Sequence, residues 1–258
     1  MEQGLVSIIS NTEVLPGVHL IWMHAPWIAS DARPGQFVMV RCSDGYDPLL
    51  RRPFSIHRID SRGRLALLFT VVGRGTAKLS QVEEGDELNL LGPLGNGFSV
   101  RSGSSELLLV AGGIGISPLV FLAEEALARG NSVTMLVGAP TVAQVYPIDM
   151  LPTGLKSVII TEDGSVGKKG LVTDFLPDFA PRADQLFACG PLSMYQVIAT
   201  QVQRLKGIPM QVSVEVRMGC GLGACYGCTV KTTKGLRQVC KDGPVFELGE
   251  IIWKELNV

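Results

Sequence analysis

Four of the six cysteines in this chain are gathered near its C-terminal end. Four residues separate Cys220 from Cys225, two separate Cys225 from Cys228, and eleven separate Cys228 from Cys240. The first three have the spacing of thiolate ligands to a 2Fe-2S cluster, and a fourth thiolate completes a set for two irons. The glycine-rich residues between them leave room for the backbone to wrap a cluster and direct N–H groups at its sulfurs. We therefore predict a 2Fe-2S site at these four cysteines.

Two other interpretations of the cysteine loop remain open. A structural zinc site also uses four cysteines, although its ligands more often form two separate short-spaced pairs. Alternatively, the thiols are buried side chains that bind no metal. A non-redox zinc scaffold would be colourless, so flavin and iron-sulfur absorption bands would exclude it.

Two further motifs could hold a cofactor that carries phosphate. The stretch Arg52-Pro53-Phe54-Ser55 enters a strand, and its guanidinium suits a diphosphate while its hydroxyl could reach the polar edge of a flat ring. The stretch Gly73-Arg74-Gly75-Thr76 precedes a short helix expected at residues 77–82, where successive N–H groups can bind phosphate oxygens. A plain turn with Thr76 as the N-cap competes with that interpretation.

A dinucleotide-type motif, GGIGISP, occupies residues 112–118 between a buried-type strand and a predicted helix. It has two glycines of the fingerprint, and Pro118 replaces the third, which suits the first turn of a helix. Its N–H groups could bind a pyrophosphate, so Gly112, Gly113 and Gly115 are predicted to contact a nicotinamide dinucleotide. Cys189-Gly190-Pro191 ends a later strand at the carboxyl edge of the sheet, where open α/β folds bind ligands.

Charges after the third strand of this region favour NAD over NADP. Glu162 and Asp163 would repel a 2′-phosphate and could accept a hydrogen bond from a ribose hydroxyl. Lys168 and Lys169 are close in sequence and oppose this preference. Reduction rates with NADH and NADPH test it.

The composition is that of a globular chain with a substantial core. Its 258 residues are 46% hydrophobic and 18% charged, which suits two domains. A net charge of −1 without a long basic run predicts no nucleic-acid partner. The sequence shows no signal-like start and no apolar run of about 18 residues, so we expect a cytoplasmic protein without a membrane partner. Cys42 and Cys189 would then be free thiols.

Residues 1–100 contain six short apolar or alternating runs separated by turn residues. The runs are LVSIIS, VHLIWM, QFVMVRC, FSIHRI, RLALLFTVV and DELNLLG. Six strands at this spacing predict an antiparallel β-barrel. Three histidines, His19, His24 and His57, are scattered through the barrel and are expected to be structural.

Residues 101–214 alternate between strands and helices instead. Strands are predicted at ELLLVAGG, SVTMLVGA, KSVIITEDG, QLFACG and MQVSVEV, and helices at residues 118–129 and 192–206. This alternation predicts a parallel sheet with helices on its faces. The expected fold is a β-barrel plus an α/β domain, followed by a cluster-binding segment at residues 215–258. Apolar residues of the tail, including Phe246 and Trp253, could face a partner or pack on the preceding domain.

The motifs at residues 52–55 and 73–76 resemble the flavin-binding barrel of the ferredoxin reductase family, which has R-x-[YFI]-S followed by G-x-G-[ST]. The resemblance implies that Arg52 and Thr76 hold the FAD diphosphate and that Ser55 faces the flavin N5 region. Phe69 stands where the family often has tyrosine, which removes a hydroxyl. The FAD residues implied are Arg52, Pro53, Phe54, Ser55, Leu68, Phe69, Thr70, Gly75 and Thr76.

The family's G-G-x-G-[IV]-[AST]-P and C-G-P elements are present as well. They imply that NAD contacts Gly112, Gly113, Gly115, Cys189 and Gly190. In this resemblance Cys189 lies near the nicotinamide and the flavin and helps to align hydride transfer.

Over essentially its whole length the chain is similar to the electron-transfer subunits of dihydroorotate dehydrogenase B. The similarity rests on RRPFSI at residues 51–56, GRGT at 73–76, GGIGISP at 112–118, EVRMGCGLGACYGC at 215–228 and VCKDGPVF at 239–246. It implies an FMN-containing catalytic partner that oxidises dihydroorotate to orotate in pyrimidine (UMP) biosynthesis, within a heterotetramer of two subunits of each kind. Electrons would pass from FMN through the 2Fe-2S cluster and FAD to NAD+. A related reductase subunit of a hydrogenase or glutamate synthase system would share these motifs, so the partner decides between them.

Overall fold

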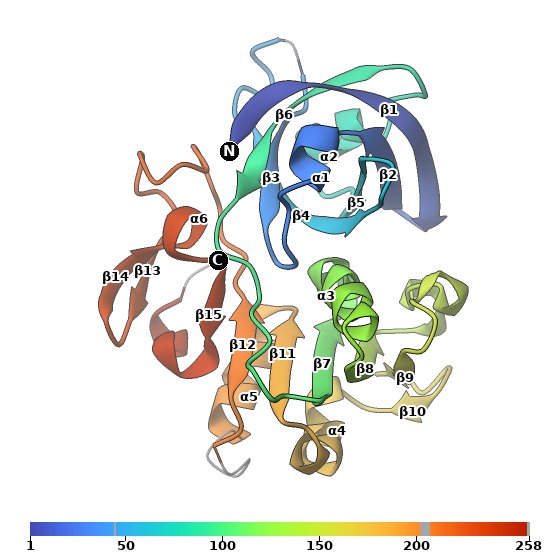
Figure 1. Cartoon of the computed structure of the whole chain (residues 1–258), viewed down its shortest axis with the longest axis vertical. Coiled ribbons are helices and arrows are strands. Elements are labelled where there is room, and N and C mark those ends of the chain that lie inside the picture. Colours follow the sequence, from blue (N-terminus) through green and yellow to red (C-terminus); the bar gives the residue numbers. More distant parts are fainter. Residues whose placement is uncertain (44, 202–206, 257–258) are drawn as a thin grey trace.

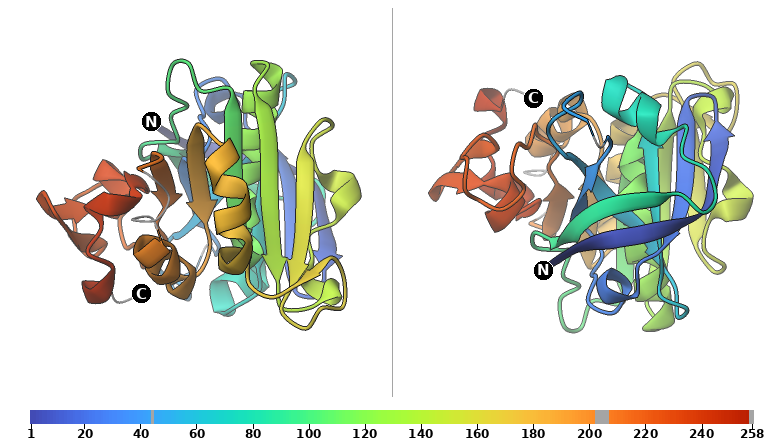
Figure 2. Two further views of the ribbon diagram at one scale, coloured as in Figure 1. Left: turned by 90° about the horizontal axis from the view of Figure 1, so that it is seen from below. Right: turned by 90° about the horizontal axis from the view of Figure 1, so that it is seen from above.

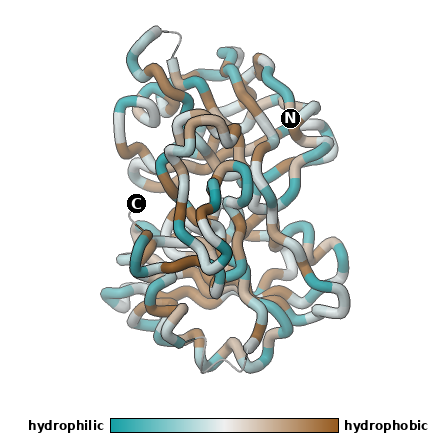
Figure 3. The backbone as a smooth tube through the Cα atoms, turned by 90° about the vertical axis from the view of Figure 1, so that its left-hand side faces the viewer, coloured by the Kyte–Doolittle hydropathy of each residue, from teal (hydrophilic) through white to brown (hydrophobic). Residues whose placement is uncertain are grey.

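The computed structural model describes residues 1–43, 45–201 and 207–256. A barrel, a parallel-sheet domain and a C-terminal segment lie in that order along the chain, and the C-terminal segment flanks the other two (Figure 1). Figure 3 shows hydrophilic stretches mostly along the outer loops and hydrophobic ones mostly inside. In the described part of the chain, no helix has both the length and the apolar character needed to cross a bilayer.

Six antiparallel strands close the barrel in the order β1-β2-β5-β4-β3-β6, which confirms the predicted architecture. They are β1 (Glu2–Leu15), β2 (Val18–His24), β3 (Phe37–Arg41), β4 (Arg52–Ile59), β5 (Arg64–Thr70) and β6 (Glu87–Leu94). Short helices α1 (Pro26–Ala29) and α2 (Arg74–Leu79) cover its ends. β1 is longer than predicted because its first half pairs with β6 and its second half with β2.

The second sheet has the order β10-β9-β8-β7-β11-β12-β15. Its strands are β7 (Glu106–Gly112), β8 (Ser132–Ala139), β9 (Lys156–Thr161), β10 (Lys168–Lys169), β11 (Gln185–Cys189), β12 (Met210–Ser213) and β15 (Val245–Glu247). All neighbouring pairs are parallel except β12 and β15. The chain leaves β7 toward β8 on one side and later returns through β11 on the other, so the strand order reverses between β7 and β11. Ligands of open α/β sheets bind at such a reversal, outside the carboxyl ends of the strands.

Helices cover both faces of this sheet. Because alternate residues of a strand point to opposite faces, Leu107 and Leu109 of β7 pack with α3 (Ile116–Ala128), whereas Leu108 and Val110 pack with α4 (Val172–Phe179) and α5 (Leu192–Gln201). Helix α3 lies between the sheet and the barrel (Figure 1). It starts two residues earlier than predicted, because a 3-10 turn at Gly113–Gly115 leads directly into it. The predicted continuation of α5 over residues 202–206 lies outside the described residues.

The C-terminal segment contributes to two structures. A hairpin of β13 (Thr229–Thr232) and β14 (Gly235–Gln238) precedes α6 (Val239–Asp242) and projects to one side of the sheet, as Figure 2 shows. β15 then pairs antiparallel with β12 and extends the sheet. The apolar tail packs on this domain, since Trp253 is buried and stacks on Tyr195 with ring centroids 4.9 Å apart.

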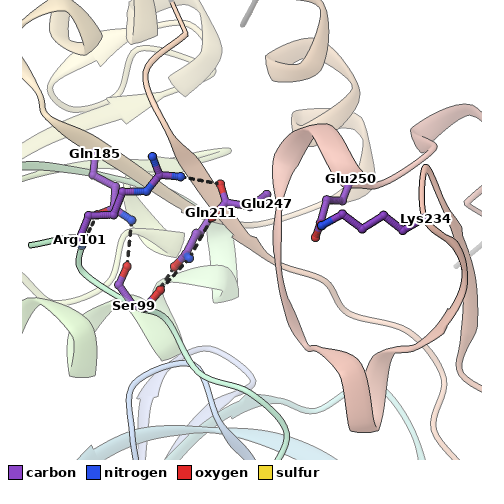
Figure 4. A network of polar contacts seen from close by, with 7 residues as sticks. All are labelled: Ser99, Arg101, Gln185, Gln211, Lys234, Glu247 and Glu250. Carbon is purple, nitrogen blue, oxygen red and sulfur yellow. Dashed lines mark hydrogen bonds and ion pairs between the residues drawn. The ribbon is translucent and has the colours of Figure 1, made fainter.

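A polar network built on two buried glutamines, Gln185 and Gln211, fixes the linker between the barrel and the sheet (Figure 4). Gln211 accepts a hydrogen bond from the Ser99 N–H and donates one to the Ser99 hydroxyl, both at 2.9 Å. Gln185 accepts one from the Arg101 N–H and donates one to the Ser99 carbonyl, again at 2.9 Å. The Glu247 carboxylate accepts a hydrogen bond from Gln211 Nε2 at 3.2 Å and forms an ion pair with Arg101 Nη2 at 3.6 Å. The linker backbone thus satisfies two buried glutamine amides that would be costly to leave unpaired.

Candidate functional site

A cavity of about 850 Å³ lies between the barrel and the sheet domain. Strands β4 and β5, the turn into α2 and the segment after β12 form its walls. All nine residues predicted to contact FAD line it: Arg52, Pro53, Phe54, Ser55, Leu68, Phe69, Thr70, Gly75 and Thr76. The volume falls within the range of small-molecule and cofactor sites.

One end of this cavity is suited to an anion. The Arg52 side chain lies against Gly75, where an added Cβ would be 3.3 Å from the guanidinium Nε. A Cβ at Gly73 would meet nothing within 4 Å, so this turn leaves open space beside the cation. A glycine-rich turn next to a guanidinium fits a diphosphate, which needs close backbone approach and positive charge.

Thr76 has a different local role from the N-cap considered above. It is the third residue of α2, and Gly73 is the N-cap. The Thr76 hydroxyl accepts hydrogen bonds from the N–H groups of Val72 at 2.9 Å and Gly73 at 3.1 Å and donates one to the Gly73 carbonyl at 3.0 Å. The Thr76 side chain therefore closes the turn, so the group that Thr76 can still offer a phosphate is its backbone N–H.

A second cavity, of about 470 Å³, lies at the carboxyl ends of β7 and β11. Of the five residues predicted to contact NAD, Gly112, Gly113, Gly115 and Gly190 line this cavity and Cys189 does not. A Cβ at Gly113 would meet nothing within 4 Å, whereas one at Gly115 would lie 2.2 Å from the Cys189 carbonyl oxygen. The turn thus leaves space for a ligand on one side and packs tightly on β11 on the other.

Acidic residues at this second cavity differ in their access to it. Glu162 lines the cavity, whereas Asp163 accepts hydrogen bonds from the Ser165 N–H and hydroxyl at 2.9 and 2.7 Å. Lys168 lies over the Phe175 ring, 4.9 Å from its centroid, and is not among the lining residues. Of the charged residues weighed for dinucleotide choice, Glu162 is the one that lines this cavity.

The two cavities share Ile114 and Glu215 as lining residues. The Glu215 side chain is exposed at the cavities, and desolvation by the protein around it raises the pKa of its carboxyl. Residues 213–218, from β12 toward the cysteine loop, all line the larger cavity. Glu215 and this segment were not predicted to be functional from the sequence, although their position directly before Cys220 was a usable signal.

Cys189 lies beneath this junction. It is fully buried and lines neither cavity. Burial is the main cause that raises the pKa of its thiol well above the usual range, and the nearby Glu215 carboxylate adds to the effect. The Tyr195 hydroxyl accepts a hydrogen bond from the Gly190 N–H at 2.9 Å and donates one to the Ser213 carbonyl at 2.6 Å. It therefore ties the end of β11 to the end of β12.

The four C-terminal cysteines form two pairs. The Cys225 side chain lies close enough to Cys220 to affect its pKa, and the Cys228 side chain affects that of Cys240, whose N–H donates to the Cys228 sulfur at 3.4 Å. Cys225 is exposed, whereas Cys228 and Cys240 are buried. Within residues 1–43, 45–201 and 207–256, no group of three or more His, Cys, Asp or Glu side chains is placed to hold one metal ion. Two pairs suit a binuclear cluster, with two cysteines on each iron, better than a mononuclear zinc site.

Backbone N–H groups surround these sulfurs. The Leu222 and Gly223 N–H groups donate to the sulfurs of Cys220 at 3.3 Å and Cys240 at 3.1 Å. Burial raises the pKa of the Cys220 thiol, but the N–H groups of Leu222, Cys225 and Ala224 outweigh it and lower the pKa to about 6. Burial and the bond with Cys228 raise the pKa of Cys240 to about 12. Donors aimed at the sulfurs stabilise thiolates, which are the ligands that iron requires.

Positive backbone φ angles allow the loop its tight path. Gly221 and Gly223 have φ of 74° and 78°, and Tyr226 has φ of 58°. A Cβ at Gly221 would lie 2.5 Å from Met39 Cγ. The loop therefore packs directly on β3 of the barrel, which brings the cysteines close to the larger cavity.

Comparisons with known proteins agree with this arrangement. Residues 215–252 match the family model of the iron-sulfur cluster binding domain of dihydroorotate dehydrogenase B. The dihydroorotate dehydrogenase B (NAD(+)) electron transfer subunit of Desulforamulus reducens is 41% identical over 250 residues, which are 93% of this chain and 95% of that protein. The subunit of the same name from Clostridium acetobutylicum is 39% identical and covers 95% of each chain.

Solved structures share the fold. The structure of an NADH-dependent reduced ferredoxin-NADP oxidoreductase, described in relation to flavin-based electron bifurcation, has a TM-score of 0.88 and 31% identity and covers 98% of this chain and 91% of that one. A ferredoxin NADP+ reductase from Neisseria gonorrhoeae with bound FAD and NADP has a TM-score of 0.68 and 16% identity, covering 80% and 92%. The second likeness concerns the fold alone.

Proposed function

The chain belongs to the family of dihydroorotate dehydrogenase B electron transfer subunits, and from this premise we propose that it connects a dihydroorotate-oxidising partner with NAD+. The partner is an FMN-containing catalytic subunit that forms orotate in pyrimidine biosynthesis, and the assembly is a heterotetramer with two subunits of each kind. Bound FAD and a 2Fe-2S cluster would supply the conversion between the two-electron chemistry of NAD and one-electron transfer. The observation that carries the proposal is the junction at Glu215, where the two cavities meet and from which the chain leads to Cys220.

The residues of the larger cavity would bind and orient FAD. Arg52 and the N–H groups of the turn at Gly75 and Thr76 would hold its diphosphate, because both present positive charge at one end of the cavity. Ser55 would face the isoalloxazine ring, and the side chains of Leu68, Phe69 and Thr70 would cover it. The apolar walls would exclude water from the ring.

The residues of the smaller cavity would bind NAD. Gly112, Gly113, Gly115 and Gly190 would leave room for its pyrophosphate, and Glu162 would accept from a ribose hydroxyl and repel a 2′-phosphate. Glu215 would orient the nicotinamide where the cavities meet. Cys189 would align the two rings indirectly, through the turn that it packs against.

The cluster would be held by Cys220 with Cys225 and by Cys228 with Cys240. We propose three functional parts, residues 1–100 for FAD, 101–214 for NAD and 215–258 for the cluster, with β15 anchoring the third part to the second.

An anaerobic assay of NAD+ reduction by dihydroorotate tests the function. The purified complex should form NADH, and neither subunit alone should do so. The isolated subunit should still reduce an artificial acceptor with NADH, which controls for loss of flavin. A complex that retains FAD and iron but forms no NADH from dihydroorotate would contradict the proposal.

A second candidate is a related reductase subunit that serves another partner, such as a hydrogenase or glutamate synthase. The similarity to the ferredoxin-NADP oxidoreductase structure, at 31% identity, favours this second candidate because that protein is a reductase with a different name and the same fold. Affinity capture from the native organism separates the two. A captured subunit that contains FMN and oxidises dihydroorotate supports the first function, and a different redox subunit supports the second.

A further inference from the structure

A buried histidine joins the barrel to the nucleotide-binding domain. His57 of β4 is fully buried, with its Nδ1 2.9 Å from the Ser117 carbonyl oxygen and its Nε2 3.0 Å from the Tyr146 hydroxyl. The two rings pack edge to face, with centroids 5.7 Å apart. Ser117 lies in the first turn of α3, and Tyr146 follows β8. One imidazole therefore contacts two elements of the second domain.

The partners determine which nitrogen carries the proton. The Ser117 carbonyl can only accept a hydrogen bond, so Nδ1 must donate, and Nε2 then accepts from the Tyr146 hydroxyl. Burial is the main cause that lowers the pKa of His57, to about 3, and the Arg58 charge adds to it. The imidazole is therefore neutral near pH 7, with both nitrogens satisfied.

This contact lies between the walls of the two cavities. Ser55, two residues before His57 on β4, lines the larger cavity, as does Ser117. Ile114 and Gly115, just before Ser117, line the smaller cavity. The hydrogen bond from His57 thus joins the strand of the flavin wall to the turn of the dinucleotide wall. His57 itself lines neither cavity.

We infer that His57 is a positioning residue for hydride transfer, acting through its hydrogen bond to the Ser117 carbonyl. The bond holds the start of α3, and with it the dinucleotide turn, in register with Ser55 on β4. Hydride transfer is sensitive to such register, because a displacement of about 1 Å between reacting groups can cost about 100-fold in rate. A neutral, fully satisfied imidazole provides a rigid link without placing a charge between the domains.

The test is the rate at which NADH reduces the bound FAD, followed by stopped-flow absorbance in the full subunit with its cluster. His57→Leu fills a similar volume but removes the donor, and we expect the reduction rate at saturating NADH to fall about tenfold. FAD content and NADH affinity should change less than threefold, and the charge-transfer absorbance between nicotinamide and flavin should weaken. His57→Asn keeps an N–H donor near the position of Nδ1 and should restore most of the rate.

A neighbouring interdomain contact supplies the matched control. Arg58 Nε and Glu124 Oε1 are 3.1 Å apart across the same interface, and Glu124 lies further along α3 from the dinucleotide turn than Ser117 does. Glu124→Gln breaks this ion pair and should leave the reduction rate unchanged. Equal slowing by Glu124→Gln and His57→Leu would overturn the inference, since any weakening of the interface would then suffice.

The inference rests on the proposed FAD and NAD sites, and the outcomes separate the two. A wild-type subunit that binds no FAD, or whose FAD is not reduced by NADH, defeats the proposed function. A normal wild type with an equally fast His57→Leu variant, or with His57→Asn as slow as His57→Leu, defeats only this inference. If His57→Leu loses flavin, His57→Gln decides, because its side-chain N–H reaches the position of Nε2 and not that of Nδ1. Reduction should then be slower than in His57→Asn, and equal rates in wild type, His57→Asn and His57→Gln would overturn the inference.

Discussion

Two adjacent arginines at the entrance to β4 have different surroundings. The Arg51 guanidinium donates to the backbone carbonyls of Asn89 at 2.9 Å and Met39 at 3.3 Å, and so bridges β6 and β3. Arg52 instead lines the larger cavity next to Gly75. The R-x-[YFI]-S register of the sequence selects Arg52 for the cofactor, but it gives no role to Arg51, because the partners of Arg51 on β3 and β6 are distant in the sequence.

Replacing each arginine by alanine should separate FAD binding from barrel stability. Arg52→Ala should weaken FAD binding by about 10- to 100-fold, because a hydrogen bond to a charged group contributes about 1.5–3 kcal/mol. Arg51→Ala should keep FAD affinity but lower the melting temperature by a few degrees. FAD titration of deflavinated protein and thermal unfolding measure the two effects. Loss of FAD affinity in Arg51→Ala with no loss in Arg52→Ala would contradict this assignment.

Glu162 should determine the choice of dinucleotide. Glu162→Gln removes the charge that would repel a 2′-phosphate, and we expect the ratio of kcat/KM for NADH to that for NADPH to fall about tenfold, equivalent to about 1.4 kcal/mol. Asp163→Asn is the matched control, because Asp163 bonds to Ser165 and does not line the cavity. A wild type that prefers NADPH, or equal effects of the two substitutions, would refute the role of Glu162.

At the scale of elements, the turn between β7 and α3 is fixed by close packing on β11. A Cβ at Gly115 would lie 2.2 Å from the Cys189 carbonyl oxygen and 2.7 Å from the Gly190 nitrogen, both backbone atoms that cannot move aside alone. Gly115 is therefore required to be glycine by the close approach of β11. Its own backbone φ of −59° is one that any residue can adopt.

Gly115→Ala should push the turn away from β11. We expect a loss of about 1–3 kcal/mol in the free energy of unfolding, as for an overpacked site, together with weaker NADH binding. Gly249→Ala is the control, because a Cβ there meets nothing within 4 Å. Denaturant unfolding and NADH titration measure both variants, and a Gly115→Ala protein as stable as Gly249→Ala would show that the turn can relax.

Local patterns predicted most elements, and long-range pairing explains what they missed. Turn residues delimit the six barrel strands and hydrophobic runs mark the parallel strands, so the two architectures followed from sequence. The strand β15 did not, because three residues carry no period and pair with β12 only through the fold. Glu215 was missed for the same reason, since its place between two cavities depends on how the domains meet. The nine residues predicted to contact FAD all line the larger cavity, because each lies within a short local motif or on the strand between two such motifs.

At the scale of the whole molecule, the domain interface supports both cavities at once. Strand β4 provides Arg52 and Ser55 to the larger cavity and His57 and Arg58 to the interface. Helix α3 packs on β4 and begins at the dinucleotide turn. The relative placement of the two cavities therefore depends on His57 and Arg58, which line neither cavity, and a change in the ionisation of His57 should affect the stability of the whole chain.

Acid should destabilise the whole chain through His57. Its pKa falls from 6.5 to about 3 on folding, so the folded protein keeps the imidazole neutral while the unfolded chain binds a proton below pH 6.5. The contribution of His57 to stability is thus present above pH 6.5 and is lost as the pH falls from there toward 3. At pH 5 the loss is about 2 kcal/mol, from about 1.4 kcal/mol per pKa unit over the 1.5 units below 6.5.

The comparison of wild type with His57→Asn isolates the contribution of His57 to the free energy of unfolding, because asparagine does not titrate. Urea unfolding at pH 7.5 and pH 5.0 should show that the stability advantage of wild type over the variant shrinks by about 2 kcal/mol at the lower pH. Other groups, such as the Glu215 carboxyl with its raised pKa, titrate in both proteins and cancel in the difference. A constant difference across this range would mean that the imidazole can take up a proton while folded, which its complete burial between Ser117 and Tyr146 does not allow.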